Sequence, residues 1–180
     1  MDPNHIMGSM DLKIVCKVIN EVLKEGNCGL DCVILFGGRE QDGMVLKAEH
    51  QLFIITDSEI DIETYLRLSG KIKIDARKAG FAFMECSLYT KSSFINIING
   101  GDTMGAFLEI VLRNGLLIHD PKKLYRDIRS KVVHDDEAFM TNCINFSKYL
   151  NSWKWEDYWT KKLRQYRFRK EAGSIGSQFM

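Results

Sequence analysis

Two short apolar blocks, separated by a glycine pair and a mixed segment, constrain the fold of this chain more than any other feature. The first block, 33–36, is Val-Ile-Leu-Phe, which suits a buried strand and is too short for an independent helix. Gly37 and Gly38 end this block, and a second apolar block follows at about 51–56. The pattern predicts a strand, a tight turn, a short helix over 39–47 and a second strand.

The glycine pair has two interpretations. Glycine permits backbone angles and close approaches that a Cβ forbids, and a helix that begins after it directs free N–H groups at whatever binds there. An anion is the natural occupant of such a turn. The alternative is that Gly37 and Gly38 form only a turn, which is the commoner role of an isolated glycine pair.

Composition limits the classes of protein that fit. The chain has 180 residues, of which 45% are hydrophobic, and this is enough for one core with a helical extension. The formal net charge of +1 selects no partner by bulk electrostatics. Five scattered cysteines favour a reducing compartment, and Cys28 with Cys32 lacks the second pair that a zinc site needs. Neither a charged-then-apolar leader nor an apolar run of about 20 residues is present, so we expect a cytoplasmic protein with no membrane contact.

One helix is predicted before the first strand. Residues 1–9 are polar and precede a second methionine, so we treat them as a tag or a disordered segment. Apolar residues recur at helical spacing over 10–25, and Gly26 with Asn27 ends this amphipathic helix.

A helix and a third strand are predicted after the second strand. Asp57 and Ser58 mark the start of a helix that runs as far as Gly70. Residues 71–74 fit a brief strand or the start of another helix equally well. The segment 80–90 is aromatic and almost continuously apolar, which predicts the third strand.

Glu85 interrupts this third strand. A carboxylate within a buried strand is costly unless it is paired, bound to a metal or at an open edge. A functional role and a solvent-facing position on an exposed side of the sheet are both consistent with Glu85.

Two helices and a short strand follow. Residues 91–99 and 103–113 show helical periodicity. Gly115 ends the second of these helices as a residue able to take positive φ. The apolar run at 116–119 predicts a short strand.

The glycine turn and its flanking strands resemble the polymerase-beta-type nucleotidyltransferases, especially the minimal and kanamycin-nucleotidyltransferase-like members. In that family a strand is followed by Gly-Ser, a short helix and an Asp-x-Asp pair that opens the next strand. Gly37 falls on the family glycine, Gly38 on its serine, and Glu49 and Gln51 on the two aspartates. The phrase FLEIVLRNGLLIHDPKKLY, from Phe107, is similar to a second family segment in which a helix leads into a turn, a short strand and an acidic residue.

The resemblance covers about 30–125 and implies an α/β (α+β) fold with a nucleotidyltransferase-like mixed sheet flanked by helices. We therefore expect a nucleotidyltransferase-like domain over 10–125, a C-terminal helical extension over 126–172 and a flexible tail over 173–180.

The resemblance also implies a catalytic site. Glu49, Gln51 and Glu85 take the places of the three family carboxylates, and Glu49 and Glu85 are the implied ligands of Mg²⁺ or Mn²⁺. Two-ion phosphoryl transfer needs concentrated negative charge, whereas Gln51 offers a neutral carbonyl oxygen. His50, between the first two of these residues, points to the opposite face of the strand and is a poor ligand candidate. The implied metal site is therefore weakened or lost.

The implied nucleotide-binding residues are Gly37, Gly38 and Arg39, which would cradle a nucleoside triphosphate. Gly38 keeps its backbone N–H but lacks the hydroxyl of the family serine. We expect nucleotide binding with one hydrogen bond fewer than in the family.

These departures favour a nucleotidyltransferase-fold protein that binds nucleotide and whose nucleotidyl transfer is weak or lost. One alternative is an active metal-dependent enzyme that moves a nucleoside monophosphate from a nucleoside triphosphate to a hydroxyl acceptor. Another is an antitoxin-like interaction protein, because small family members pair with helical partners. A homodimer or a helical protein partner is consistent with that resemblance, and whether the chain is an enzyme stays open.

The C-terminal extension is rich in aromatic and basic residues. Asp135 and Asp136 indicate a helix cap and first-turn acids, and apolar periodicity over 139–150 predicts the helix. Aromatic and basic side chains are interleaved over 151–171, a mixture that stacks bases and neutralises phosphates. The candidate nucleic-acid-binding residues are Trp153, Trp155, Lys161, Lys162, Arg164, Arg167 and Arg169. The favoured alternative is an amphipathic helix docked by its aromatic residues, with a solvated basic face.

Overall fold

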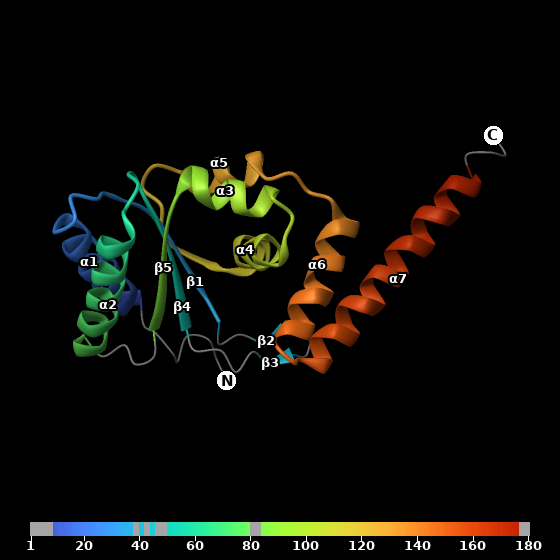
Figure 1. Cartoon of the computed structure of the whole chain (residues 1–180), viewed down its shortest axis with the longest axis horizontal. Helices are drawn as coiled ribbons and strands as arrows, with labels where there is room; N and C mark the ends of the chain where they lie inside the picture. The colour runs from blue at the N-terminus through green and yellow to red at the C-terminus, as the bar shows by residue number, and fades with distance from the viewer. Residues whose placement is uncertain (1–8, 38–39, 42–43, 46–49, 80–83, 177–180) are drawn as a thin grey trace. The chain divides into compact units, whose positions relative to one another are not determined.

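A computed structural model describes residues 9–37, 40–41, 44–45, 50–79 and 84–176 (Figure 1). Its elements, in chain order, are α1 (Ser9–Lys24), β1 (Leu30–Phe36), β2 (Glu40–Gln41), β3 (Met44–Val45), β4 (His50–Thr56), α2 (Ile62–Lys78), β5 (Met84–Thr90), α3 (Lys91–Asn99), α4 (Thr103–Asn114), β6 (Leu116–His119), α5 (Leu124–Lys131), α6 (Asp136–Tyr149) and α7 (Trp153–Gly176). The chain divides into two compact units, the first formed by 1–96 with 110–131 and the second by 97–109 with 132–180.

The first unit is built on a four-stranded mixed sheet with the strand order β5-β4-β1-β6. β4 pairs with β5 in parallel, whereas β1 pairs antiparallel with both β4 and β6. The residues from Cys32 to Phe36 and from Leu52 to Thr56 are all buried, because helices cover both faces of the sheet. The predicted α+β class and the predicted third strand are confirmed, the latter over its described residues.

One face of the sheet packs against α1 and α2, which lie side by side (Figure 1). Side chains from these strands and helices form one buried cluster. Its members include Val33, Leu35, Leu52 and Ile54 from the strands and Val15, Ile19, Leu68 and Ile72 from the helices. Each such side chain contributes about 1.5–3 kcal/mol when it leaves water, so the cluster holds both helices on the sheet.

The opposite face of the sheet carries an aromatic cluster. The ring centroid of Phe53 lies 6.4 Å from that of Phe36 and 6.5 Å from that of Tyr89. The Tyr89 ring makes an edge contact with Phe94 of α3 at 5.4 Å. Because these four rings come from β1, β4, β5 and α3, they connect the three strands to one another and to α3 on this face.

The helix predicted over 39–47 is wrong. The described residues of this segment form the two-stranded sheet of β2 and β3, with Glu40 opposite Val45 and Gln41 opposite Met44. An isolated nine-residue helix is marginal in water. The sequence between the two strands is Asp-Gly, a strong hairpin signal that the helix prediction overlooked.

The start predicted for α2 is also wrong. Asp61, not Asp57, is the N-cap, and its carboxylate accepts the N–H of Thr64 at 2.9 Å. The carboxylate of Asp57 accepts the N–H of Gly29 at 2.7 Å and the hydroxyl of Ser58 at 3.0 Å. These hydrogen bonds, chiefly the one from Gly29, lower the pKa of Asp57 below its usual value. Asp57 therefore ties the end of β4 to the loop before β1.

Residues 71–74, which the sequence left undecided, and Gly115 can now be assigned. α2 continues through Gly70 to its end, so 71–74 is helical. Gly115 does not take the predicted positive φ. A Cβ at Gly115 would lie 2.3 Å from Cγ2 of Ile34 and 2.6 Å from the carbonyl oxygen of Val111, so this glycine is required by space and not by its backbone angle.

The second unit is helical, and α6 and α7 form an antiparallel hairpin. Glu137 at the start of α6 binds Arg167 late in α7, whereas Lys148 near the end of α6 lies 3.9 Å from Glu156 early in α7. The carboxylate of Asp135 accepts two backbone N–H groups of the first turn of α6, which confirms the predicted cap.

Aromatic side chains connect the helices of the second unit. The rings of Phe107 and Phe146 stack at 5.0 Å, and Phe139 of α6 meets Trp159 of α7 edge-on at 5.4 Å. Leu163, one turn after Trp159, is buried. α7 thus docks on α6 through aromatic and apolar side chains, as the docked-helix alternative predicts. Within the described ranges, no helix is long and apolar enough to span a bilayer.

Candidate functional site

The ends of three strands bring part of the predicted site together. Gln51 of β4 lies opposite Phe36 of β1 and opposite Glu85 of β5. Residues in register on neighbouring strands project from the same face, so the side chains of Gln51 and Glu85 are neighbours. Gly37 follows Phe36 directly and takes a φ of 106°, which only glycine adopts readily. The described half of the implied site therefore lies at one end of the sheet.

Three predicted site residues, Glu49, Gly38 and Arg39, lie outside the described residues. Their roles remain those that the family resemblance implies. His50 precedes Gln51 on β4 and so projects from the opposite face, as predicted. Its Nδ1 is buried and has no hydrogen-bond partner among the described residues.

Glu85 is an edge residue with a cationic partner. Its side chain is 53% exposed, which reconciles a carboxylate with a strand position. Lys73 of α2 places its Nζ at 2.6 Å from Oε1 of Glu85. The positive charge of Lys73 therefore offsets the negative charge of Glu85.

The described donors do not fit a two-ion metal centre. Gln51 is neutral, and Glu85 is already paired with a lysine, so the two together supply no net negative charge. Two divalent ions held close together need anionic ligands to offset their repulsion. Among the described residues, no group of three or more His, Cys, Asp and Glu side chains is placed to hold a metal ion.

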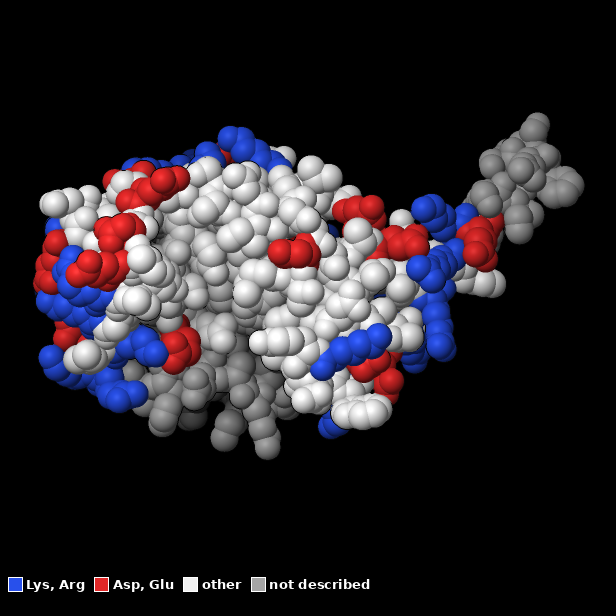
Figure 2. All heavy atoms as spheres, in the orientation of Figure 1, with Lys and Arg blue, Asp and Glu red and all other residues white. Residues whose placement is uncertain are grey.

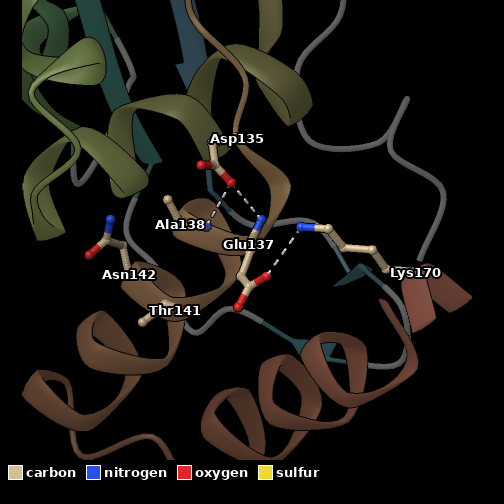
Figure 3. Close-up of a pocket in the computed structure, with 6 residues that line it drawn as sticks. All are labelled: Asp135, Glu137, Ala138, Thr141, Asn142 and Lys170. Atoms are coloured by element: carbon tan, nitrogen blue, oxygen red, sulfur yellow. Dashed lines mark hydrogen bonds and ion pairs between the residues drawn. The ribbon is translucent and has the colours of Figure 1, made fainter. Parts of the chain in front are cut away.

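A second polar cluster lies in the helical unit, around a pocket of about 420 Å³. The residues that line it are Asp135, Glu137, Ala138, Thr141, Asn142 and Lys170. Figure 3 shows Lys170 reaching from α7 toward Glu137 of α6. The carboxylate of Asp135 points toward the backbone N–H groups of Glu137 and Ala138 and accepts a hydrogen bond from each, as the N-cap of α6.

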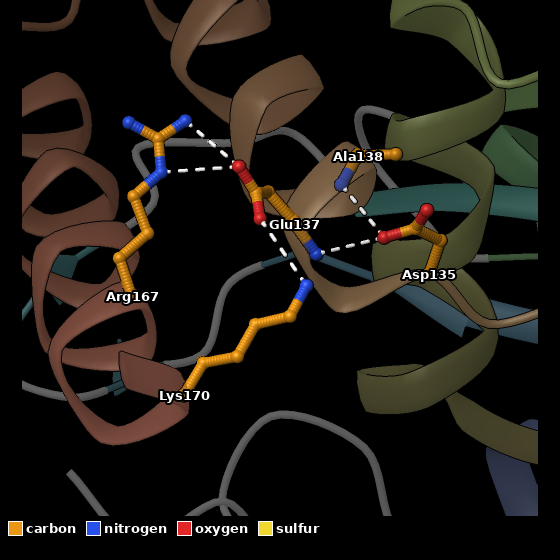
Figure 4. Close-up of polar contacts among 5 residues, drawn as sticks. All are labelled: Asp135, Glu137, Ala138, Arg167 and Lys170. Atoms are coloured by element: carbon orange, nitrogen blue, oxygen red, sulfur yellow. Dashed lines mark hydrogen bonds and ion pairs between the residues drawn. The ribbon is translucent and has the colours of Figure 1, made fainter. Parts of the chain in front are cut away.

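The charges around this pocket are mutually neutralised (Figure 4). Oε1 of Glu137 accepts hydrogen bonds from Nε and Nη2 of Arg167 at 3.1 and 2.9 Å. Nζ of Lys170 lies 4.0 Å from the other oxygen of Glu137. This is the arrangement of a solvated ion-pair network that ties α7 to α6, and it offers no free carboxylate for acid–base chemistry.

The candidate nucleic-acid-binding residues of α7 fall into two groups. Three of them have partners within the second unit: the Trp155 ring stacks on Trp159 at 6.1 Å, Lys162 lies over the Tyr158 ring, and Arg167 binds Glu137. The others are exposed. They are Trp153, Lys161, Arg164 and Arg169.

The exposed group extends along the side of α7 that faces away from α6. Lys161, Arg164 and Phe168 are spaced at i, i+3 and i+7, which places them on one face of the helix. Phe168 is 73% exposed and Trp153 is 80% exposed. Figure 2 shows the Lys and Arg side chains gathered along the part of the surface that α7 forms.

Sequence reasoning missed two residues that matter for these sites. Lys73 lies 12 positions before Glu85, and only a helix that continues through Gly70 could have placed it near the third strand. Phe168 was part of the aromatic pattern but was not among the candidate residues. Its spacing to Lys161 and Arg164 is a signal that a helical projection of α7 would have revealed.

Comparison of the chain with protein-family models, with curated proteins and with solved structures finds no match.

Proposed function

We propose that the first unit is a nucleotidyltransferase-fold module that binds a nucleoside triphosphate and has weak or no nucleotidyl transfer. One observation carries the proposal: Gln51 and Glu85 are neighbours at the strand ends beside Gly37, and Lys73 binds Glu85. This arrangement is consistent with the layout that the family resemblance implies, and its described charges cancel, which disfavours a pair of bound cations.

Lys73 has a chemical consequence for the proposed ligand. In an active member of the family, metal ions offset the charge of the triphosphate. Lys73 cancels the charge of Glu85 without a metal, so a triphosphate meets no net repulsion from that carboxylate, and the N–H groups next to a glycine turn are hydrogen-bond donors to phosphate oxygens. The proposed binding therefore depends less on Mg²⁺ than transfer chemistry would.

Isothermal titration calorimetry with nucleoside triphosphates tests this proposal. We expect binding of the full chain both with Mg²⁺ and with a chelator present, and a Kd that differs by less than about tenfold between the two conditions, or about 1.4 kcal/mol. Lys73→Met should weaken the binding, because it removes the cation. The matched control is Lys78→Met, which removes an exposed lysine from the end of the same helix.

Two results would count against the proposal. Absence of triphosphate binding would contradict the proposal that the first unit binds a nucleotide. Rapid transfer of nucleoside monophosphate to a hydroxyl acceptor, dependent on Mg²⁺, would favour the active enzyme. Radiolabelled triphosphate with a panel of hydroxyl acceptors distinguishes the second result from simple binding.

The exposed face of α7 favours a second candidate function, the binding of single-stranded nucleic acid. Lys161 and Arg164 offer two cations for the phosphates, and Phe168 offers an exposed ring on which a base stacks. Binding to single-stranded RNA should fall steeply with salt concentration. Phe168→Ala and Arg164→Gln should each weaken it, whereas Arg167→Gln, which alters the pair with Glu137, should weaken it less.

A further inference from the structure

The outward face of α2 carries a row of exposed apolar side chains. Ile62, Leu66 and Ile74 are 73%, 63% and 57% exposed. With Gly70 they occupy every fourth position of the helix, and residues at this spacing form one continuous ridge. The stripe that faces the sheet is separate and consists of Leu68, Ile72 and Ala76. α2 is therefore apolar on two sides, and only one of these is used within the first unit.

Gly70 forms a notch in this ridge. A Cβ added at Gly70 would have no heavy atom within 4 Å, so packing within the chain does not require a glycine there. Gly115 differs, because its Cβ would collide with Ile34. Glycine weakens a helix interior, so an unneeded glycine between Leu66 and Ile74 has a cost without a benefit inside the chain. A second helix that approaches closely at the notch supplies that benefit.

The charges on the same face change sign along the helix. Glu63 lies in the first turn of α2, and Arg77 and Lys78 lie in its last turn. Neither Glu63 nor Arg77 has an ion-pair partner among the described residues. Glu63 near one end of this face and Arg77 near the other are complementary to the same two residues of a surface turned end for end. The helix macrodipoles favour this antiparallel arrangement as well.

We propose that this face of α2 binds the same face of a second copy of the chain, about a two-fold axis that passes between Leu66 and Gly70. In such an isologous interface each copy contributes the same residues. Leu66 of each copy enters the notch at Gly70 of the other, and Ile62 of each meets Ile74 of the other. The ridge is thus complementary to itself, because Leu66 of each copy lies opposite the Gly70 notch of the other.

The proposed register also pairs the free charges. At 1.5 Å per residue, Glu63 lies about 7.5 Å from the axis and Arg77 lies about 13.5 Å from it on the opposite side. In the second copy, Arg77 therefore lies on the Glu63 side, about 6 Å further out. Helix side chains lean toward the helix N-terminus, so Glu63 leans outward and Arg77 of the second copy leans inward. Their lengths close the remaining distance.

A single pair of helices forms an interface at the small end of the range for specific association, below about 1,200 Å² in total. We therefore expect a reversible dimer with a dissociation constant in the micromolar range. The proposal does not depend on nucleotide binding, because none of these residues belongs to the strand-end site.

Sedimentation velocity over a concentration series of the full chain tests the dimer. The wild type should shift from monomer to dimer as its concentration rises through the micromolar range. Gly70→Gln fills the notch while its side chain enters open space, so it should raise the dissociation constant at least about tenfold without loss of thermal stability. Phe168→Gln, which changes an exposed apolar residue of α7, is the matched control and should leave dimerisation unchanged.

A charge exchange identifies the register. Glu63→Arg alone and Arg77→Glu alone should each raise the dissociation constant about fivefold, because each places like charges together at two symmetric positions. The double variant should return it to within about twofold of the wild type. A wild type that stays monomeric, a dimer that Gly70→Gln does not weaken, or a double variant without recovery would each overturn the proposal.

Discussion

Two glutamates, one in each unit, bind basic side chains in locally similar ways but in different surroundings. Glu85 is bound by Lys73 at 2.6 Å, and Glu137 is bound by Arg167 at 2.9 Å. Glu85 lies at the strand ends beside Gln51 and a glycine turn. Glu137 lies in the first turn of a helix and joins that helix to its neighbour.

The difference shows that an ion pair is informative only through what lies around it. The ion pair of Glu137 with Arg167 holds two helices together, and Lys170 lies near the second oxygen of the same carboxylate. The pair of Glu85 cancels a charge at the position where the family resemblance places a metal ligand. The same interaction therefore joins two helices in the second unit, and in the first unit it supports the proposed loss of a metal site.

The largest expected effect comes from removal of the core beneath the strand-end site. Phe53 is buried between Phe36 and Tyr89, so Phe53→Ala should destabilise the first unit by about 3–5 kcal/mol. Urea denaturation followed by circular dichroism measures this loss. Phe168→Ala, at an exposed position of α7, should change stability by less than about 0.5 kcal/mol. Equal effects of the two changes would contradict the assignment of Phe53 to the core.

The next effect tests how the second unit is held together. Trp159→Ala removes the ring contacts with Phe139, Trp155 and Tyr158 and should cost about 2 kcal/mol, less than for a fully buried ring. Trp153→Ala, in the same helix at a position that is 80% exposed, is the matched control. A melting temperature lowered as much by the control as by Trp159→Ala would show that α7 is not docked through this face.

The two glutamates themselves should differ in a smaller but measurable way. Glu137→Gln should destabilise the hairpin by at most about 1 kcal/mol, and a double-mutant cycle with Arg167→Gln should recover a coupling that high salt removes. Glu85→Gln should leave stability almost unchanged, and its effect should appear in triphosphate binding. If Glu85→Gln destabilises the chain more than Glu137→Gln, the comparison between the two pairs fails.

The smallest expected effect is a pH dependence at the turn between β4 and α2. The N–H of Gly29 and the hydroxyl of Ser58 hold the pKa of Asp57 below 3.8, its usual value. The folded state therefore gains stability from the ionised carboxylate above that value and loses it as the pH falls through the lowered folded pKa. Asp57→Asn should reduce the slope of stability against pH below about 4. Unfolding curves at a series of acidic pH values measure the slope, and an unchanged slope would exclude this contribution.

The sequence predicted those parts of the fold that local patterns determine. The apolar blocks predicted β1 and β4, and the helical periodicities predicted α1, α3 and α4. Asp135 indicated the cap of α6. The segment after Gly38 was misread, because propensity over nine residues is a weaker signal than the Asp-Gly hairpin pair within it.

The candidate site was predictable only in part, because its charge balance depends on long-range contacts. The family resemblance predicted that Gly37, Gln51 and Glu85 lie together, and the strand register places Gln51 opposite Phe36 and opposite Glu85. No local pattern indicated that Lys73, in a helix thought to end at Gly70, reaches the Glu85 carboxylate. Tertiary packing determines such pairs, and sequence spacing does not.

The most direct test of the central claim is the calorimetric titration of Mg²⁺, in the presence of a nonhydrolysable triphosphate, into the wild type and into the double variant Gln51→Asp, Lys73→Met. The variant adds one carboxylate and frees Glu85, so it should gain Mg²⁺ binding that the wild type lacks. Glu85→Gln introduced into the variant should remove the gain. Tight Mg²⁺ binding by the unmodified chain, or no gain in the double variant, would contradict the view that these strand ends are a nucleotidyltransferase site with its metal charge balance lost.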